Sequence, residues 1–137
     1  MFKLVSNLTC WWPVKVMEPD PDKPGKYIER QFEAEFTVLD REESKRIDDI
    51  RSEMLKVFES DLSEDGLKKG QAELDAYDVN AFRRVLKDWR GILDDTDQPF
   101  RFTEENFAIA MRHERIRVAL NRSYQEAISQ DRARLGN

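Results

Sequence analysis

Residues 26–39, KYIERQFEAEFTVL, alternate between apolar and polar side chains, and this alternation constrains the fold more than any other feature. The apolar set is Phe32, Ala34, Phe36 and Val38, and the polar set is Gln31, Glu33, Glu35 and Thr37. Successive side chains of a strand point to opposite faces, so a period of two predicts a strand with one buried face.

The preceding segment, residues 8–17, reads LTCWWPVKVM and is rich in residues that favour strands. It is joined to the alternating segment by EPDPDKPG, which contains three prolines and a glycine. We therefore expect an antiparallel hairpin with a long, proline-stiffened loop. Such a hairpin is only marginally stable alone and must pack on another element.

The two adjacent tryptophans of the first strand are expected on opposite faces. If the valines that follow them face the core, Trp12 joins the valines and Trp11 points outward. Pro13 removes a ladder donor, which predicts that this strand lies at a sheet edge or bulges there. Trp11 is then either a docking surface for another chain or is packed beneath Phe2, Leu4 or a helix, and the sequence leaves both open.

Helical patterns follow the hairpin. Asp40 is a suitable N-cap with Glu43 three residues later, which predicts a helix over residues 41–60. Its apolar stripe predicts an amphipathic helix that faces the core: Ile47, Ile50, Met54, Val57 and Phe58. Residues 61–77 contain two glycines and no sustained period, so we expect a linker or mobile loop with at most one helical turn, near residues 72–74. A second stripe starts at residue 79, after a cap at Asp75 or Asp78, and consists of Phe82, Val85, Leu86 and Trp89.

Residues 88–111 join two helical segments through a compact, aromatic-rich turn. Gly91 is expected in a left-handed conformation at a helix end, Pro99 stops that helix from continuing, and Thr103 caps the next one. We expect this next helix over about residues 104–112 and a last helix over about 114–134. In the last helix, Ile116, Ala119, Leu120, Ala127 and Ile128 are expected to point inward, and Arg115, Arg122, Arg132 and Arg134 to face solvent.

These segments predict an α+β fold in which a small antiparallel N-terminal hairpin or sheet packs on about four helices. A length of 137 residues fits a single domain, 1–137. Within it we expect a β-hairpin region (1–39), a helix (40–60), a linker (61–77) and a helical C-terminal part (78–137).

Charged residues make up 37% of the chain and give a formal net charge of −5, so nucleic acid is a poor partner. The charge is uneven, because residues 40–65 hold ten acids and five bases (−5), whereas residues 112–137 hold six arginines and three acids (+3). This asymmetry suits head-to-tail self-association, and solvated charges on helix surfaces are the simpler explanation.

The expected compartment follows from what the sequence lacks. The longest apolar run is residues 10–14, too short to cross a membrane, and no basic start followed by an apolar stretch marks a secretory signal. Cys10 is the only cysteine, which excludes an internal disulfide and fits a reducing interior. We therefore expect a cytoplasmic protein that does not bind membranes.

Side chains for catalysis or metal binding are sparse. His113 is the only histidine and lies in a charged run, RHER, that offers no partner for a zinc site or a nucleophile pair. Asp94, Asp95 and Asp97 are the best candidate ligands for calcium or magnesium, and a solvated turn explains them as well. We predict that the protein is not an enzyme and takes no cofactor, with a small metal-dependent enzyme or regulator as the alternative.

Residues 85–128, VLKDWRGILDDTDQPFRFTEENFAIAMRHERIRVALNRSYQEAI, resemble the C-terminal half of tail assembly chaperones from long-tailed phages and prophages. In that family a helix ends near a tryptophan and is followed by an acidic turn with a glycine, a proline, a short helix start and a final helix. The matching residues are Trp89, Gly91, Asp94, Asp95, Pro99, Phe102, Thr103, Asn106 and Tyr124. The N-terminal strands and the acidic helix after them are also similar to the lambdoid and HK97-like members.

The resemblance implies a non-enzymatic chaperone in the host cytoplasm that keeps the tape measure protein soluble and helps recruit major tail tube subunits. It also implies self-association and absence from the mature virion. A virion structural protein, such as a tail completion factor, is the alternative. The residues that we expect to contact other chains are Trp11, Phe100, Phe102 and Arg122.

Members of this family often make a longer product by ribosomal frameshifting near the end of the short reading frame. Leu135, Gly136 and Asn137 are compatible with a slippery codon sequence, and an ordinary C-terminus explains them as well. The amino-acid sequence leaves both explanations open.

Overall fold

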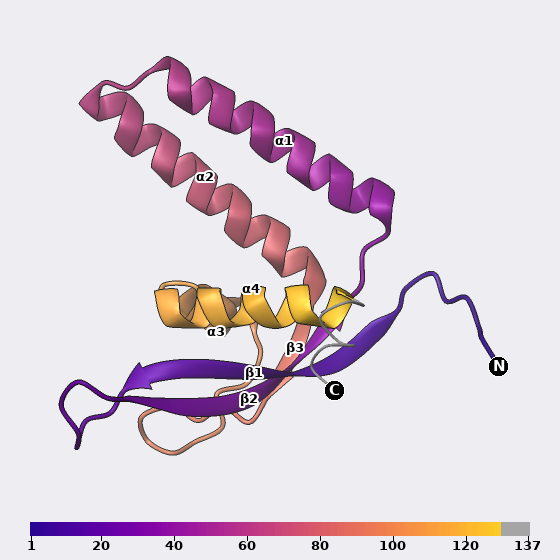
Figure 1. Cartoon of the computed structure of the whole chain (residues 1–137), viewed down its shortest axis with the longest axis vertical. Coiled ribbons are helices and arrows are strands. Elements are labelled where there is room, and N and C mark those ends of the chain that lie inside the picture. The colour runs from indigo at the N-terminus through magenta and orange to yellow at the C-terminus, as the bar shows by residue number, and fades with distance from the viewer. Residues whose placement is uncertain (130–137) are drawn as a thin grey trace. The chain divides into compact units, whose positions relative to one another are not determined.

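The computed structural model describes residues 1–129 and has the α+β fold that the sequence predicts. Over these residues the chain forms an antiparallel three-stranded sheet and four helices (Figure 1). The elements in chain order are β1 (Thr9–Pro19), β2 (Tyr27–Thr37), α1 (Arg41–Ser60), α2 (Glu64–Val85), β3 (Leu86–Arg90), α3 (Glu104–Ala110) and α4 (Glu114–Ile128).

The chain divides into two compact units. The helical unit consists of Met1–Leu8 and Thr37–Val85, and the sheet unit consists of Thr9–Phe36 and the chain from Leu86 onward. The single domain expected over residues 1–137 stays a prediction.

The predicted hairpin is confirmed as β1 and β2. The backbone N–H of Asp20 donates to the carbonyl of Lys26 at 2.9 Å and closes the proline-rich loop. Phe32, Ala34 and Phe36 are buried, and the polar residues that alternate with them are half-buried or exposed. The period of two in the sequence therefore corresponds to one buried face of β2.

β3 completes the sheet in the order β1-β2-β3, which leaves β1 at an edge, as its internal proline predicts. The prediction that Leu86 and Trp89 continue a helical stripe is wrong, because both lie in β3 and are buried there. Their spacing of three still suits a strand because the β2–β3 register shifts between Glu35 and Phe36. Gly91 is left-handed as predicted, with φ of 85°, but it follows this strand and not a helix.

Helix α4 packs along β1 within the sheet unit (Figure 1). The ring of Tyr124 meets that of Phe36 edge to face, with 5.4 Å between the centroids. The hydroxyl of Ser123 donates to the carbonyl oxygen of Pro13 at 3.0 Å. These contacts cover the apolar face that an isolated hairpin would leave exposed.

Most, though not all, of the inward positions expected in α4 are covered. Ala119 and Leu120 are buried as predicted, whereas Ile128, the last residue of the helix, is 39% exposed. Arg132 and Arg134, which were expected to face solvent, lie outside the described residues, as does the possible frameshift segment 135–137.

Local N-cap signals correctly predict where two helices begin. The carboxylate of Asp40 accepts a hydrogen bond from the backbone N–H of Glu43 at 2.8 Å, at the start of α1. The hydroxyl of Thr103 accepts one from the N–H of Asn106 at 3.0 Å, at the start of α3. Both caps satisfy donors that the first turn of a helix leaves free.

The helical unit is built on α1 and α2, which lie side by side (Figure 1). The prediction that α1 faces a core is wrong, since no residue of Arg41–Ser60 is buried. Within this unit α1 has one long helical neighbour, so its apolar stripe is only partly covered. Ile47, Met54 and Phe58 are half-buried, and Ile50 and Val57 are exposed.

The predicted linker over residues 61–77 is also wrong, because α2 begins at Glu64. A short turn precedes it, in which the carboxylate of Asp61 accepts hydrogen bonds from the N–H and hydroxyl of Ser63. These bonds lower the pKa of Asp61. The hydroxyl of Ser63 in turn accepts from the N–H of Gly66 at 3.1 Å and caps α2.

Glycine content explains why the sequence suggested a loop there. Gly66 and Gly70 both lie inside α2, where they face side chains of the preceding segment at close range. Their role is therefore close packing and not chain flexibility. The two aspartates that were expected to cap this helix, Asp75 and Asp78, lie in its interior.

Candidate functional site

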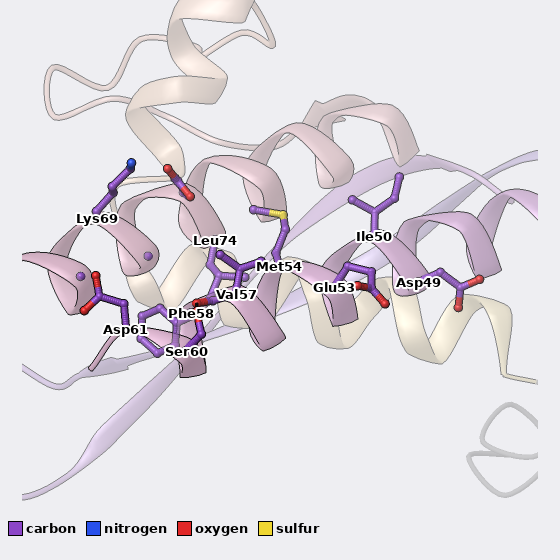
Figure 2. A pocket seen from close by; sticks show the side chains of 13 residues that line it. Asp49, Ile50, Glu53, Met54, Val57, Phe58, Ser60, Asp61, Lys69 and Leu74 are labelled. Carbon is purple, nitrogen blue, oxygen red and sulfur yellow. Dashed lines mark hydrogen bonds between the residues drawn. The ribbon is translucent and has the colours of Figure 1, made fainter. Parts of the chain in front are cut away.

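An apolar groove of about 570 Å³ lies between α1 and α2 in the helical unit (Figure 2). Its apolar lining consists of Ile50, Met54, Val57, Phe58 and Leu74. Leu74 is buried, but Val57 is 68% exposed and Ile50 is 44% exposed. The groove therefore presents apolar surface to solvent on a helix pair that is otherwise strongly charged.

Two glycines of α2 shape the floor of this groove. A Cβ atom at position 70 would overlap the phenyl ring of Phe58, and one at position 66 would overlap the carboxylate of Asp61. Because Gly66 and Gly70 have no side chains, Asp61 and Phe58, at the end of α1, can approach the backbone of α2 closely.

Carboxylates dominate the border of the groove. Figure 2 shows Asp49, Glu53 and Asp61 near the apolar side chains of α1, and the lining also includes Glu73 and the single lysine Lys69. The rim is therefore acidic, with four carboxylates and one ammonium group.

Two of these acids have lysine partners in the same helix. Lys45 lies 2.9 Å from Asp49, and Lys56 lies 3.2 Å from Glu53. All four side chains are largely exposed, so solvent and salt weaken both pairs. Residues 40–85 as a whole hold thirteen acids and nine bases (−4), which keeps the surroundings of the groove negative.

Polar contacts between the two helices lie next to the groove. The guanidinium of Arg51 donates two hydrogen bonds to the carboxylate of Asp78, at 2.9 and 3.2 Å, and this pairing raises the pKa of Arg51. The hydroxyl of Tyr77 donates to the carbonyl of Ile47 at 3.0 Å. These polar contacts connect α1 and α2 beside the groove.

The sequence-predicted contact residue Trp11 lies elsewhere, on β1. The guanidinium of Arg90 lies 4.0 Å from the centroid of the Trp11 ring, and its Nε donates to the carboxylate of Glu33 at 3.0 Å. Trp12 points the other way and its indole N–H reaches Glu126 of α4 at 3.5 Å. The expected opposite orientation of the two tryptophans is confirmed, and contact of Trp11 with another chain stays a prediction.

Phe100 and Phe102 are brought together around Trp89. Phe100 stacks on the indole with 5.9 Å between ring centroids, and Phe102 meets it edge to face at 4.9 Å. The indole N–H donates to the carbonyl of Phe100 at 2.7 Å. Both phenylalanines are half-buried, while Arg122 is exposed on α4 and Trp11 belongs to β1. The four predicted contact residues therefore lie on three different parts of the sheet unit.

The aspartates considered as metal ligands lie in the turn after β3. The carboxylate of Asp94 accepts hydrogen bonds from the N–H and hydroxyl of Thr96 and from the N–H of Gln98, and these bonds lower its pKa. Asp97 adopts a left-handed conformation, with φ of 62°. Asp94 thus holds the turn together, and residues 1–129 contain no group of three or more potential His, Cys, Asp or Glu ligands suited to a metal ion.

The single histidine and the single cysteine lie in ordinary environments. His113 is exposed at the start of α4, makes no capping hydrogen bond, and has its Nδ1 3.4 Å from a guanidinium nitrogen of Arg115. Cys10 is half-buried, and burial together with the charge of Glu35 raises the pKa of its thiol. A raised pKa makes Cys10 a weaker nucleophile at neutral pH.

The α2 side of the groove comes from residues that were assigned to a linker. Two sequence signals mark them as helical. Ser63 is followed by the acids Glu64 and Asp65, which is typical of a capped helix start. Apolar residues then recur at intervals of three or four: Leu74, Tyr77, Ala81 and Val85.

In comparisons with known proteins, no family model, no curated protein and no solved structure matches the chain. Within residues 1–129, none of the helices combines the length and the apolar character that a membrane span requires.

Proposed function

We propose that this protein is a non-enzymatic chaperone of phage tail assembly that holds apolar helical segments of the tape measure protein in the α1–α2 groove. The observation that carries the proposal is the groove itself, with Val57 and Ile50 exposed at its surface. Helical segments with an apolar stripe commonly bind in such grooves.

The resemblance of residues 85–128 to tail assembly chaperones supports the more specific part of the proposal. On this proposal the protein acts in the host cytoplasm, associates with copies of itself, helps recruit major tail tube subunits and is absent from the finished particle. The long, highly charged helices suit such a role, because they keep a complex with an apolar client soluble.

Co-production with the tape measure protein tests the proposal. We expect the tape measure protein to be insoluble alone, and to become soluble and co-purify when this protein is made with it. The variant Val57→Asp is expected to lose this effect, because it puts a charge into the apolar lining. Since Val57 is 68% exposed, the variant should fold normally.

A matched control is available on α4. Val118 is 44% exposed on a helix of the sheet unit, so Val118→Asp adds the same charge away from the groove. We expect Val118→Asp to keep the tape measure protein soluble and Val57→Asp to fail to do so. Solubilisation by Val57→Asp at the wild-type level would overturn the role of the groove.

The proposed absence of the protein from the virion has its own test. Mass spectrometry of purified particles is expected to find the tail tube and tape measure proteins without this chain. Stoichiometric recovery of the chain in the particles would contradict a chaperone role and favour a structural protein of the virion.

A further inference from the structure

The dimensions of the groove favour a helix as its occupant. The lining runs along α1 from Asp49 to Asp61, a rise of about 18 Å at 1.5 Å per residue. Val57 and Ile50 on this lining are 68% and 44% exposed, so the groove is open to solvent. An elongated, open apolar surface of this length fits about three turns of a helix laid along the pair.

The charge of the rim favours a basic occupant. Carboxylates stand on both sides of the apolar lining, with Asp49 and Glu53 on α1 and Glu73 on α2. A helix lying in the groove would place the residues that flank its own apolar stripe next to these carboxylates. Lysine or arginine at those flanking positions would be attracted, and glutamate or aspartate would be repelled.

We infer that the groove selects amphipathic helices whose apolar stripe is flanked by basic residues. This inference rests on the proposed function and names the chemistry of the client segment. Apolar contact supplies the binding energy, and the acidic rim discriminates between helices that bury the same apolar surface.

Three labelled peptides of about 18 residues, or five helical turns, test the inference by fluorescence anisotropy. The first carries a leucine stripe flanked by lysine, the second carries the same stripe flanked by glutamate, and the third is a scrambled version of the first. We expect the lysine-flanked peptide to bind at least about tenfold more tightly than the glutamate-flanked one. The scrambled peptide should bind poorly, because charge without an apolar stripe does not fill the groove.

Charge reversal on the rim provides the decisive comparison. The double variant Glu53→Lys/Glu73→Lys is expected to remove or invert the preference for lysine flanks. Glu59→Lys is the matched control, because Glu59 is exposed on α1 but does not line the groove. The control should retain the preference, and Val57→Asp should weaken the binding of both amphipathic peptides.

Equal affinity for the two amphipathic peptides, or a preference that survives Glu53→Lys/Glu73→Lys, would overturn the inference. Self-association that blocks peptide binding and is lost in Val57→Asp would also overturn it, since the occupant would then be a second copy. If the protein solubilised the tape measure protein but bound the two amphipathic peptides equally, the proposed function would hold and the inference about basic flanks would be wrong. Selective peptide binding without solubilisation would instead remove the chaperone proposal and keep the helix preference.

Discussion

The phenyl ring of Phe58 in α1 lies directly against the backbone of Gly70 in α2, where any Cβ atom would overlap it. This contact joins the end of one helix to the start of the next and borders the groove. It also explains why a glycine is tolerated in a helix interior, where alanine would ordinarily be more favourable by about 1 kcal/mol.

The first prediction is that Gly70→Ala destabilises the protein by about 1 kcal/mol, because overpacking against Phe58 outweighs the gain in helix propensity. In a Phe58→Ala background the same change should stabilise by about 1 kcal/mol, since the obstructing ring is gone. Urea unfolding followed by circular dichroism measures both. Stabilisation of the same size in both backgrounds would contradict the packing described here.

The second prediction concerns pH. Burial and the nearby charges of Asp78 and Asp48 raise the pKa of the Tyr77 hydroxyl above its ordinary value of 10.0. A folded-state pKa above the unfolded one means that this contribution to stability is fully present below pH 10.0 and is lost as the pH rises through the folded value.

Tyr77→Phe should therefore remove a hydrogen bond worth about 1 kcal/mol at neutral pH and reduce the loss of stability at alkaline pH. Urea unfolding at neutral pH and just above pH 10.0 provides the measurement. Tyr27→Phe, at a ring that is 69% exposed, serves as the control and should keep the wild-type alkaline profile. Identical alkaline profiles for wild type and Tyr77→Phe would show that titration of Tyr77 does not contribute to the loss of stability.

The third prediction is that Phe100→Ala lowers the free energy of unfolding by about 2 kcal/mol, because the ring is half-buried against Trp89. Leu93→Ala, in the same turn and 59% exposed, should change it by less than about 0.5 kcal/mol. Urea unfolding followed by tryptophan fluorescence distinguishes the two. If Phe100→Ala left stability unchanged and abolished partner binding, Phe100 would be a contact residue as the sequence suggested.

The fourth prediction is that Trp11 and Arg90 are coupled by about 0.5 to 1 kcal/mol, the usual range for an exposed cation–π pair. A double-mutant cycle with Trp11→Leu and Arg90→Gln measures this coupling. Arg90→Gln should also shift the tryptophan emission to longer wavelength as the indole becomes more hydrated. Additive effects of the two substitutions would show that the ring and the guanidinium do not interact in solution.

Local patterns in the sequence were sufficient to predict part of the fold. The alternation around Phe32, Ala34 and Phe36 identified β2, because the side chains of a strand with one buried face alternate between apolar and polar. The caps at Asp40 and Thr103 were recognisable because each acts on a backbone N–H three residues away.

The parts of the fold that were predicted wrongly depend on contacts between residues that are distant in the sequence. Gly70 reads as a helix breaker until Phe58 is known to occupy the space beside it. Leu86 and Trp89 read as a helical stripe until the register shift in the sheet is known. The groove was missed because one of its two walls was assigned to a linker, although the cap at Ser63 and the apolar spacing from Leu74 to Val85 indicated a helix there.

We propose that this protein binds the apolar helices of another chain in the α1–α2 groove. Backbone amide NMR of the ¹⁵N-labelled protein, titrated with a soluble helical fragment of the tape measure protein, locates the binding surface. Shift changes are expected to concentrate in residues 49–61 and 66–74, which include the residues that line the groove. Changes confined to the strand around Trp11 and the turn around Phe100, or no changes at all, would contradict it.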